Sequence, residues 1–482
     1  MARLILLFCA VISMINAQCT VEKAEPQLRR SIYEFSIDLL QRTAQDTEYH
    51  FVSSPLSVWT LLASASLGAA DETLSEMKKV LRLSRNKCFN NKYLEIANLV
   101  TSVDESDVFL ERSAVIFADD QGRITDIYKN KVARSKISEI EEISFENLDQ
   151  AAAMINDFVR TATHDTIDDI VSPSDLENVV LVMIDALFFK GTWSKPFSEE
   201  DTEESAFYND LNVQVGDVQL MYSMDEYNVT VLDQLQAQVL ELPYGQNRRF
   251  SMFVFLPLME ASLATVIDSL QHVSLPAIRK LFATYGPTQT IVQLPRFKVS
   301  SDLSNLKELL SDMGLRAPFD STVASFPIIS DSEIYISNMI QKAEIEVNEQ
   351  GTTASAASAA EFVSRTRPTQ FNANRPFLFM IVDNNNDIPI FTGFYSIIRI
   401  EHVNANLYGI KAAPSTGLRG YRFDPIQIRV NVLDEYDRIK LALRTNIIPT
   451  ITPRKKYIVN MFVFLILILS LSYFITENLS II

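Results

Sequence analysis

The sequence predicts an α+β fold built on a large β-sheet. Helical periodicity dominates the first third of the chain, and apolar runs typical of strands recur in the rest. One of these runs, residues 179–189, is continuous and begins with β-branched residues, as expected for a central strand that is covered on both faces. At 482 residues, with 47% hydrophobic and 21% charged residues, the chain can bury a large core, as one big domain or as two or three smaller ones.

The individual elements follow from local patterns. Residues 29–43 place their apolar side chains on roughly one helical face, and residues 55–69 predict a second, mostly buried helix. Later apolar runs at 251–256, 290–294 and 377–382 predict further strands. No internal repeat is present.

The N-terminus has the pattern of a secretory signal. Arg3 is followed by an apolar run over residues 4–15 and then by Asn16-Ala17-Gln18. We expect residues 1–17 to be a signal peptide cleaved near Ala17, and the mature protein to be extracellular.

The cysteines and a glycosylation motif also bear on the predicted extracellular location. Of the three cysteines, Cys9 leaves with the signal peptide, so Cys19 and Cys88 remain. Two thiols are too few for a disulfide-dense scaffold, and they either pair or stay free. Asn228-Val229-Thr230 is an acceptor triplet for N-glycosylation.

Charge argues against polyanionic partners. A net charge of −17 disfavours general binding of nucleic acid, which requires concentrated positive charge. A modest basic cluster before residue 130 consists of Arg82, Arg85, Lys87 and Lys92. It is either a solvated helix face or a local polyanion site.

Catalytic motifs are absent from the sequence. It contains no Gly-x-Ser-x-Gly elbow, no His-Glu-x-x-His, no Cys-x-x-Cys and no glycine-rich phosphate loop, and its four histidines have no ligand spacing. We therefore expect neither an enzyme nor a metal or cofactor site.

The segment 349–361 has an unusual composition. Between Glu349 and Glu361 it is small, uncharged and free of proline. In a period-two register the side chains of one face are all small, so that the segment could enter an existing sheet as an extra strand without overpacking. These inward-facing residues are Thr352, Ala354, Ala356 and Ser358.

Several further motifs accompany this segment, and they follow one another in a definite order and at definite spacings along the chain. They are residues 54–58 with Gly68-Ala69, 181–197, 240–244, 251–257, 294–298, 313–314, 340–353 and 374–379. Over roughly residues 28–396 this series resembles the serpin family.

The resemblance implies a serpin fold, with about nine helices around three β-sheets, over residues 18–396. It implies an exposed reactive loop at about residues 349–373 that a protease cleaves. The freed hinge then inserts into the main sheet while the protease is still covalently attached, and the bound enzyme is inactivated. The hinge residues it indicates are Glu349, Gly351, Thr352, Thr353, Ala354, Ser355, Ala356, Ala357 and Ser358.

The same resemblance places the reactive bond at Arg365-Thr366. Counting seventeen residues from Glu349, or nine back from Asn374, leads to Arg365. Arginine there suits a trypsin-like protease, whose specificity pocket contains a carboxylate. Arg367 is the alternative, although the Pro368 that follows it hinders such cleavage.

Two positions depart from the family pattern at the base of the loop. Ser54, Pro55 and Ser57 match the family there, but Asp185 stands where the family usually has Asn, and Gln341 where it usually has His. A carboxylate and an amide can still share a hydrogen bond, and a different pH response of sheet opening is expected.

The C-terminal residues do not match the family. Residues 397–456 are expected to pack poorly against the serpin body, and 477–482 are a short tail. Residues 457–476 are uncharged and long enough to span a bilayer, but Arg454-Lys455-Lys456 on the outer side oppose the positive-inside tendency. A membrane anchor, a hydrophobic tail that is removed, and an extension that does not reflect the main product all fit.

The sequence therefore predicts a secreted, monomeric inhibitor that forms a covalent complex with an Arg-directed serine protease. Two alternatives stay open, which are a non-inhibitory serpin that acts as a binding or carrier protein and an inhibitor of cysteine proteases.

Overall fold

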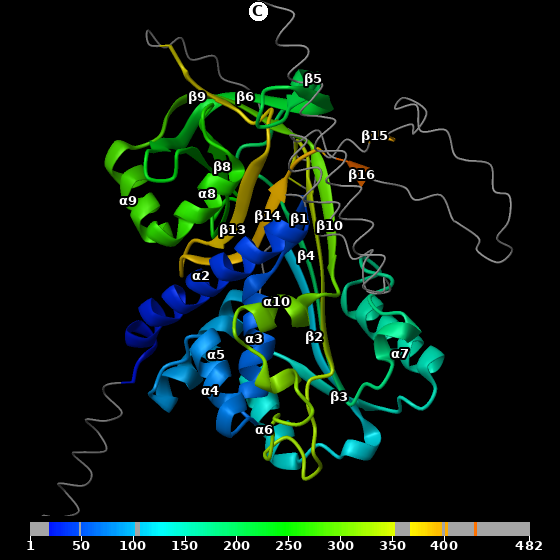
Figure 1. Cartoon of the computed structure of the whole chain (residues 1–482). Coiled ribbons are helices and arrows are strands. Elements are labelled where there is room, and N and C mark those ends of the chain that lie inside the picture. The colour runs from blue at the N-terminus through cyan, green and yellow to red at the C-terminus, as the bar shows by residue number, and fades with distance from the viewer. Residues whose placement is uncertain are drawn as a thin grey trace, which may run out of the picture. The chain divides into compact units, whose positions relative to one another are not determined.

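The computed structural model describes residues 19–47, 50–101, 107–351, 367–397, 401–402 and 429–430. The chain divides into two compact units, Met1–Ile397 and Ile398–Ile482. The described residues of the second unit form one short antiparallel pair, β15 (Glu401–His402) with β16 (Arg429–Val430). All other described elements belong to the first unit (Figure 1).

The described part of the first unit contains nine α-helices, in agreement with the expected number. They are α2 (Val21–Asp46), α3 (Pro55–Ser66), α4 (Asp71–Val80), α5 (Lys87–Thr101), α6 (Asp126–Ser135), α7 (Leu148–Ala162), α8 (Leu263–Ser269), α9 (Leu275–Tyr285) and α10 (Leu306–Asp312). The two predicted helices are confirmed as α2, which begins eight residues before the expected start, and α3.

One sheet has five strands. Its order is β10 (Phe297–Leu303), β11 (Asn338–Val347), β4 (Leu181–Gly191), β2 (Val108–Asp119) and β3 (Glu139–Ile143). The β4–β11 and β2–β3 pairs are parallel, and the other two pairs are antiparallel.

The other large sheet has nine strands. They are β1 (Phe51–Ser53), β14 (Ile388–Tyr395), β13 (Phe377–Asp383), β8 (Phe250–Pro257), β7 (Ala237–Pro243), β6 (Gln214–Leu232), β9 (Thr288–Pro295) and β12 (Thr369–Asn372) in order, with β5 (Glu203–Tyr208) paired to β6. The long β6 pairs with β7 at one end and with β5 and β9 at the other. If the nine-stranded sheet is divided at β6, it forms two sheets. Together with the five-stranded sheet, these are the three sheets that the family resemblance implied.

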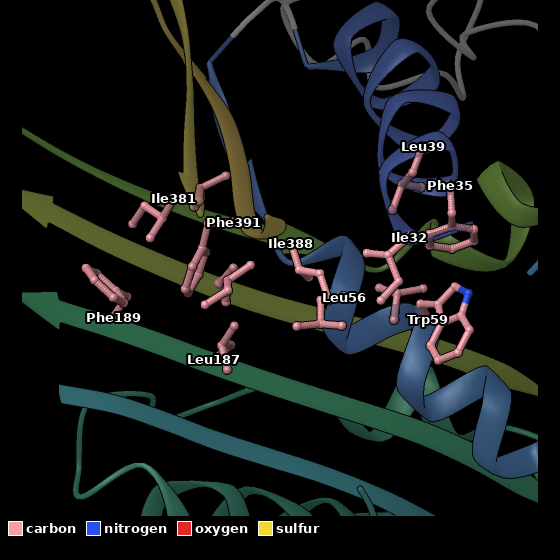
Figure 2. Packing of buried hydrophobic residues seen from close by; sticks show 14 of the residues in the cluster. Ile32, Phe35, Leu39, Leu56, Trp59, Leu187, Phe189, Ile381, Ile388 and Phe391 are labelled. Atoms are coloured by element: carbon pink, nitrogen blue, oxygen red, sulfur yellow. The ribbon is translucent and has the colours of Figure 1, made fainter. Parts of the chain in front are cut away.

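Three buried clusters hold these layers together. In one, α7 contributes Ile155 and Val159 to one face of the five-stranded sheet. In another, α2, α8 and α9 cover a face of the nine-stranded sheet. The largest joins the two sheets with α2 and α3, and Figure 2 shows Leu187 of β4, Phe391 of β14 and Trp59 of α3 within it. Each large sheet thus has a face in this shared core.

The continuous apolar run at 179–189 is confirmed as the central strand β4. Its side chains alternate between the two buried clusters, with Val182, Ile184 and Ala186 on the α7 side and Met183, Leu187 and Phe189 in the shared core. Asp185, which falls on the shared-core side by this alternation, is completely buried. A carboxyl group in such a place requires hydrogen-bond or charged partners.

Cys19 and Cys88 form a disulfide, with Cα atoms 6.2 Å apart. This decides between the two states left open by the sequence. The bond joins the residue two positions before α2 to the second residue of α5. Since α2 also contacts α3 and β14, the disulfide fastens α5 to the body of the first unit.

No helix among the described residues is long and apolar enough to cross a membrane. The hydrophobic segment 457–476 and the expected signal peptide lie outside the described residues, so the predictions made for them stay predictions.

Candidate functional site

The candidate site is the base of the predicted reactive loop, where β11 ends and the chain turns at Asn348–Gly351. The indole N–H of Trp193 donates to the carbonyl of Asn348 at 2.9 Å, and the backbone N–H of Trp193 donates to the carbonyl of Gln350 at 3.1 Å. Trp193 is almost fully buried and stacks on Tyr244, with ring centroids 4.3 Å apart. The segment that follows β4 therefore holds the start of the loop.

Glu349 is the second anchor of this turn. Its backbone carbonyl accepts a 2.7 Å hydrogen bond from the N–H of Phe197. Its carboxylate is buried, accepts a 2.8 Å hydrogen bond from the Thr202 hydroxyl and lies 3.5 Å from the Arg296 guanidinium. A buried carboxylate with these partners fixes the turn in one position.

Gly351 closes the turn through an isolated bridge to Asn348, with φ at +84°. A Cβ atom added there would lie 2.2 Å from the carbonyl oxygen of Gly191 and 2.4 Å from the backbone nitrogen of Trp193. Both the positive φ and the close approach of the backbones require glycine.

Below the turn, β11 and β4 pair in parallel, with Asn338–Ile345 opposite Val182–Phe189. Their other neighbours, β10 and β2, are antiparallel to them. A chain that reversed after Gly351 and entered between the two strands would be antiparallel to both, which is the slightly more stable pairing. At this junction, a strand that followed Gly351 would therefore have an antiparallel neighbour on each side.

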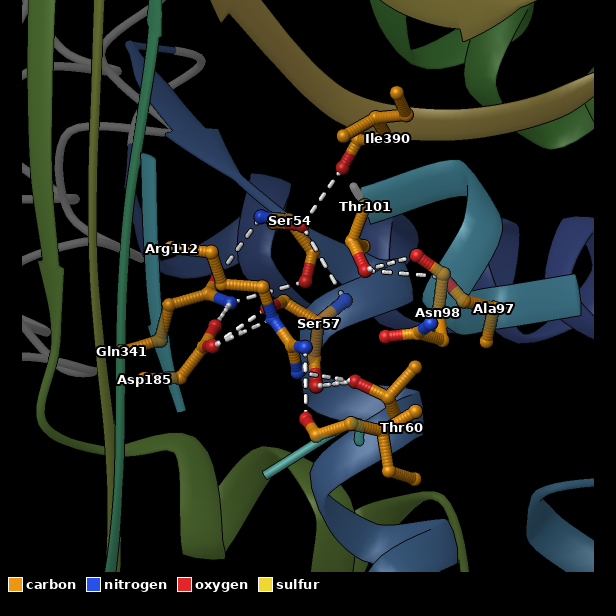
Figure 3. A network of polar contacts seen from close by, with 11 residues as sticks. Ser54, Ser57, Thr60, Ala97, Asn98, Thr101, Arg112, Asp185, Gln341 and Ile390 are labelled. Atoms are coloured by element: carbon orange, nitrogen blue, oxygen red, sulfur yellow. Dashed lines mark hydrogen bonds and ion pairs between the residues drawn. The ribbon is translucent and has the colours of Figure 1, made fainter. Parts of the chain in front are cut away.

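A polar cluster spans this junction inside the shared core (Figure 3). Gln341 and Asp185 are direct partners in the β11–β4 register, and the Gln341 amide donates to the Asp185 carboxylate at 2.6 Å. The Ser57 hydroxyl donates to the other carboxylate oxygen at 2.5 Å. Gln341 also exchanges two 2.9 Å hydrogen bonds with the backbone of Ser54, whose hydroxyl donates to the carbonyl of Ile390.

Arg112 completes the cluster, and the sequence analysis missed it. Its guanidinium donates to Ser57 at 2.6 Å, to Thr60 at 2.5 Å and to the carbonyl of Ile137 at 2.8 Å, and lies 3.7 Å from the Asp185 carboxylate. We call Ser54, Ser57, Arg112, Asp185 and Gln341 the Asp185 network. Burial raises the pKa of the Asp185 carboxyl, while Arg112 and the donated hydrogen bonds oppose that rise.

The other predicted site residues fall into three groups. Pro55 is buried as the first residue of α3, where its missing N–H costs no helical hydrogen bond. Arg367 is exposed just before β12. The hinge residues Thr352, Thr353, Ala354, Ser355, Ala356, Ala357 and Ser358 and the reactive bond Arg365-Thr366 lie outside the described residues.

Two further predicted groups have partners in the structure. The Asn228 side-chain amide lies within β6 and donates at 2.8 Å to Glu241, so the nitrogen that would carry a glycan is already engaged in a hydrogen bond. In the basic cluster, Arg82 pairs with Glu34 and Asp38, and Lys92 pairs with Glu95. These contacts reduce the charge available to a polyanion.

Comparison with protein families supports the resemblance found in the sequence. A model of the family described as serpin (serine protease inhibitor) matches residues 30–397.

Relatives and solved structures agree with this match. Serpin B9 of Homo sapiens is 30% identical over 372 residues, covering 75% of this chain and 97% of that protein. The leukocyte elastase inhibitor of Xenopus tropicalis is 29% identical over 368 residues, with the same coverage. The crystal structure of Manduca sexta serpin-12 superposes with a TM-score of 0.67 at 24% identity, covering 76% of this chain and 98% of that chain. Uncleaved ovalbumin gives 0.66 at 24% identity, covering 76% and 99%.

Proposed function

The chain belongs to the serpin family, and we propose that it is a secreted single-use inhibitor of trypsin-like serine proteases that is cleaved at Arg365-Thr366. The observation that supports this most is the β4–β11 junction. There, the chain leaves β11 next to the parallel strand β4, so that it could turn back and enter between these two strands. The segment that follows β11 has only small, uncharged inward residues.

The proposed reaction begins as ordinary proteolysis. The protease serine attacks the carbonyl carbon of Arg365, the peptide bond to Thr366 breaks, and Thr366 leaves with a free amino group. The protease stays joined to Arg365 as an acyl ester. Insertion of the freed loop then competes with hydrolysis of that ester.

The structure supports a definite register for the inserted strand. The Asn348–Gly351 bridge is a ready first rung of an antiparallel ladder. Continuing it places residues 352, 354, 356 and 358 opposite Val347, Ile345, Ala343 and Gln341, which are all buried. Residue 358 is Ser358, so its hydroxyl would enter between Gln341 and Asp185 and could take over their hydrogen bond. The inward residues of the hinge thus match the buried face that they would meet.

Two observations support secretion. The signal pattern ends at Ala17, two residues before Cys19, and Cys19 is in a disulfide. Disulfides persist in oxidising compartments and are rare in the cytosol. A glycan on Asn228 remains part of this proposal, as does a monomeric state.

The test is to mix the purified chain with trypsin, separate the products on a denaturing gel, and determine the N-terminus of the released C-terminal fragment. A complex that survives SDS, with a fragment starting at Thr366, is expected. Arg365→Ala should abolish complex formation, and the matched control Arg367→Ala should leave it intact. Clean cleavage without a complex would favour a non-inhibitory serpin, and the reverse behaviour of the two variants would move the reactive bond to Arg367.

A further inference from the structure

We propose that Arg112 is a positioning residue for inhibition. It serves as the counter-ion of Asp185 and so stabilises the hydrogen bond between Asp185 and Gln341. That bond in turn keeps β4 and β11 paired until the loop is cleaved. This inference rests on the proposed function for its biological meaning. Its structural basis, the Asp185 network, is independent of any protease.

The hydrogen bonds of the network fit an ionised Asp185. The carbonyl oxygen of the Gln341 side chain accepts from the N–H of Ser54, so its amide nitrogen is the atom that donates to Asp185. The Ser57 oxygen accepts from Arg112, so its proton points to Asp185. Both carboxylate oxygens accept, and neither contact needs a proton on the carboxyl group.

Arg112 supplies the charge that balances this anion. The groups that face Asp185 from the surrounding elements are the Ser57 hydroxyl of α3, the Gln341 amide of β11 and the Arg112 guanidinium of β2. Among these contacts, all within the part of the chain that the structure describes, Arg112 is the one charged group. Asp185 is fully buried and the Arg112 side chain is 9% exposed, so water contributes little screening.

The place of Arg112 in the sheet separates its role from that of Gln341. β2 lies on the side of β4 away from β11, so Arg112 and Asp185 can remain paired when β4 and β11 part. Within the Asp185 network, the Gln341–Asp185 hydrogen bond is the side-chain link between β4 and β11, in addition to the backbone pairing of the two strands. An ionised acceptor makes that link a charge-assisted hydrogen bond, which is about twice as strong as a neutral one.

Removing Arg112 alone should therefore open the junction. A buried carboxylate without its counter-ion is strongly destabilising unless it takes up a proton. Its folded-state pKa would then lie well above the unfolded value, so the stability that Asp185 supplies would be present at acidic pH and lost as pH rises through the folded-state pKa.

The test is a double-mutant cycle on the full, uncleaved chain with Arg112→Met, Asp185→Asn and both together. The measurement is hydrogen–deuterium exchange of peptides from β4 and β11, with β13 as an internal control. We expect Arg112→Met to speed exchange in β4 and β11 roughly tenfold or more when Asp185 is present. In the Asp185→Asn background the same change should have a much smaller effect, because no buried charge is left unpaired.

The pH profile gives a second readout that a merely structural role would not move. After correction for intrinsic exchange, opening in Arg112→Met should increase from pH 5 to pH 8, and in the double variant it should stay flat. If Arg112→Met alone does not fold but the double variant does, the charge pairing is equally supported. Equal effects of Arg112→Met in the two backgrounds, or failure of both variants to fold, would overturn the proposal.

The exchange experiment and the trypsin experiment test the two proposals independently of each other. A wild-type chain that is cleaved without forming a complex would contradict the proposed function and leave the exchange result unaffected.

Discussion

Gly351 illustrates how a single residue fixes the turn at Asn348–Gly351. It combines a φ of +84° with a backbone approach too close for any side chain, directly beside the turn after β4. The surrounding contacts come from the main chain, from the buried Trp193 and Glu349, and from the side chains of Asn348 and Gln350. The turn at Asn348–Gly351 is therefore held by its backbone geometry as well as by hydrogen bonds.

We predict that Gly351→Ala destabilises the uncleaved protein by at least about 1–2 kcal/mol, the cost of a left-handed conformation for an L-residue. The clash with the Gly191 carbonyl adds to this. Chemical denaturation measures the change. Gly122→Ala is the matched control, since its added Cβ would meet nothing within 4 Å; equal midpoints for the two variants would contradict the role given to Gly351.

The residues of the candidate site were partly predictable. Ser54, Ser57, Asp185 and Gln341 were found because each lies in a motif of the family. Arg112 was missed because its partner is distant in sequence, and only the β2–β4 register, with Ala114 opposite Asp185, makes the two diagonal neighbours. The available signal was a lone carboxyl group in the apolar run 179–189, which called for a cation elsewhere.

At the scale of elements, the disulfide links α5 to the N-terminal end of α2. It closes a loop with a sequence separation of 69 residues, so it restricts the unfolded chain considerably. This link also constrains a helix whose own described contacts are mainly with α2, α3 and α6.

We predict that Cys19→Ser with Cys88→Ser lowers the free energy of unfolding by about 2–4 kcal/mol. Denaturant titration under oxidising conditions measures the difference from wild type. Under reducing conditions wild type and variant should unfold together. A variant as stable as the oxidised wild type would show that the bond contributes nothing.

Elements with strong local patterns were predicted well, and those fixed by tertiary pairing were not. The strands at 251–256, 290–294 and 377–382 are confirmed within β8, β9 and β13. The sequence did not indicate the length of β6, because exposed residues recur along the whole strand and its extent is set by pairing with β7, β5 and β9. Nor could it show that β4 and β11 are neighbours.

At the scale of the whole molecule, the proposed inhibition requires the five-stranded sheet to accept one more strand between β4 and β11. The five-stranded sheet buries β4 and β11 between the α7 cluster and the shared core, so an inserted segment must be free of bulk and charge. The hinge sequence meets that condition. The uncleaved form would then be held kinetically, and cutting the loop would release it to a more stable state.

The most direct measurement is the unfolding temperature of the chain before and after cleavage within the reactive loop, for wild type and for Thr352→Arg. Insertion should raise the unfolding temperature of cleaved wild type by at least about 10 °C, which for a domain of this size corresponds to roughly 8 kcal/mol of added stability. Thr352→Arg should show little or no rise, because a charged side chain would have to enter the buried face. An unchanged unfolding temperature for cleaved wild type would contradict strand insertion, and an equal rise in both proteins would contradict the inward register of Thr352.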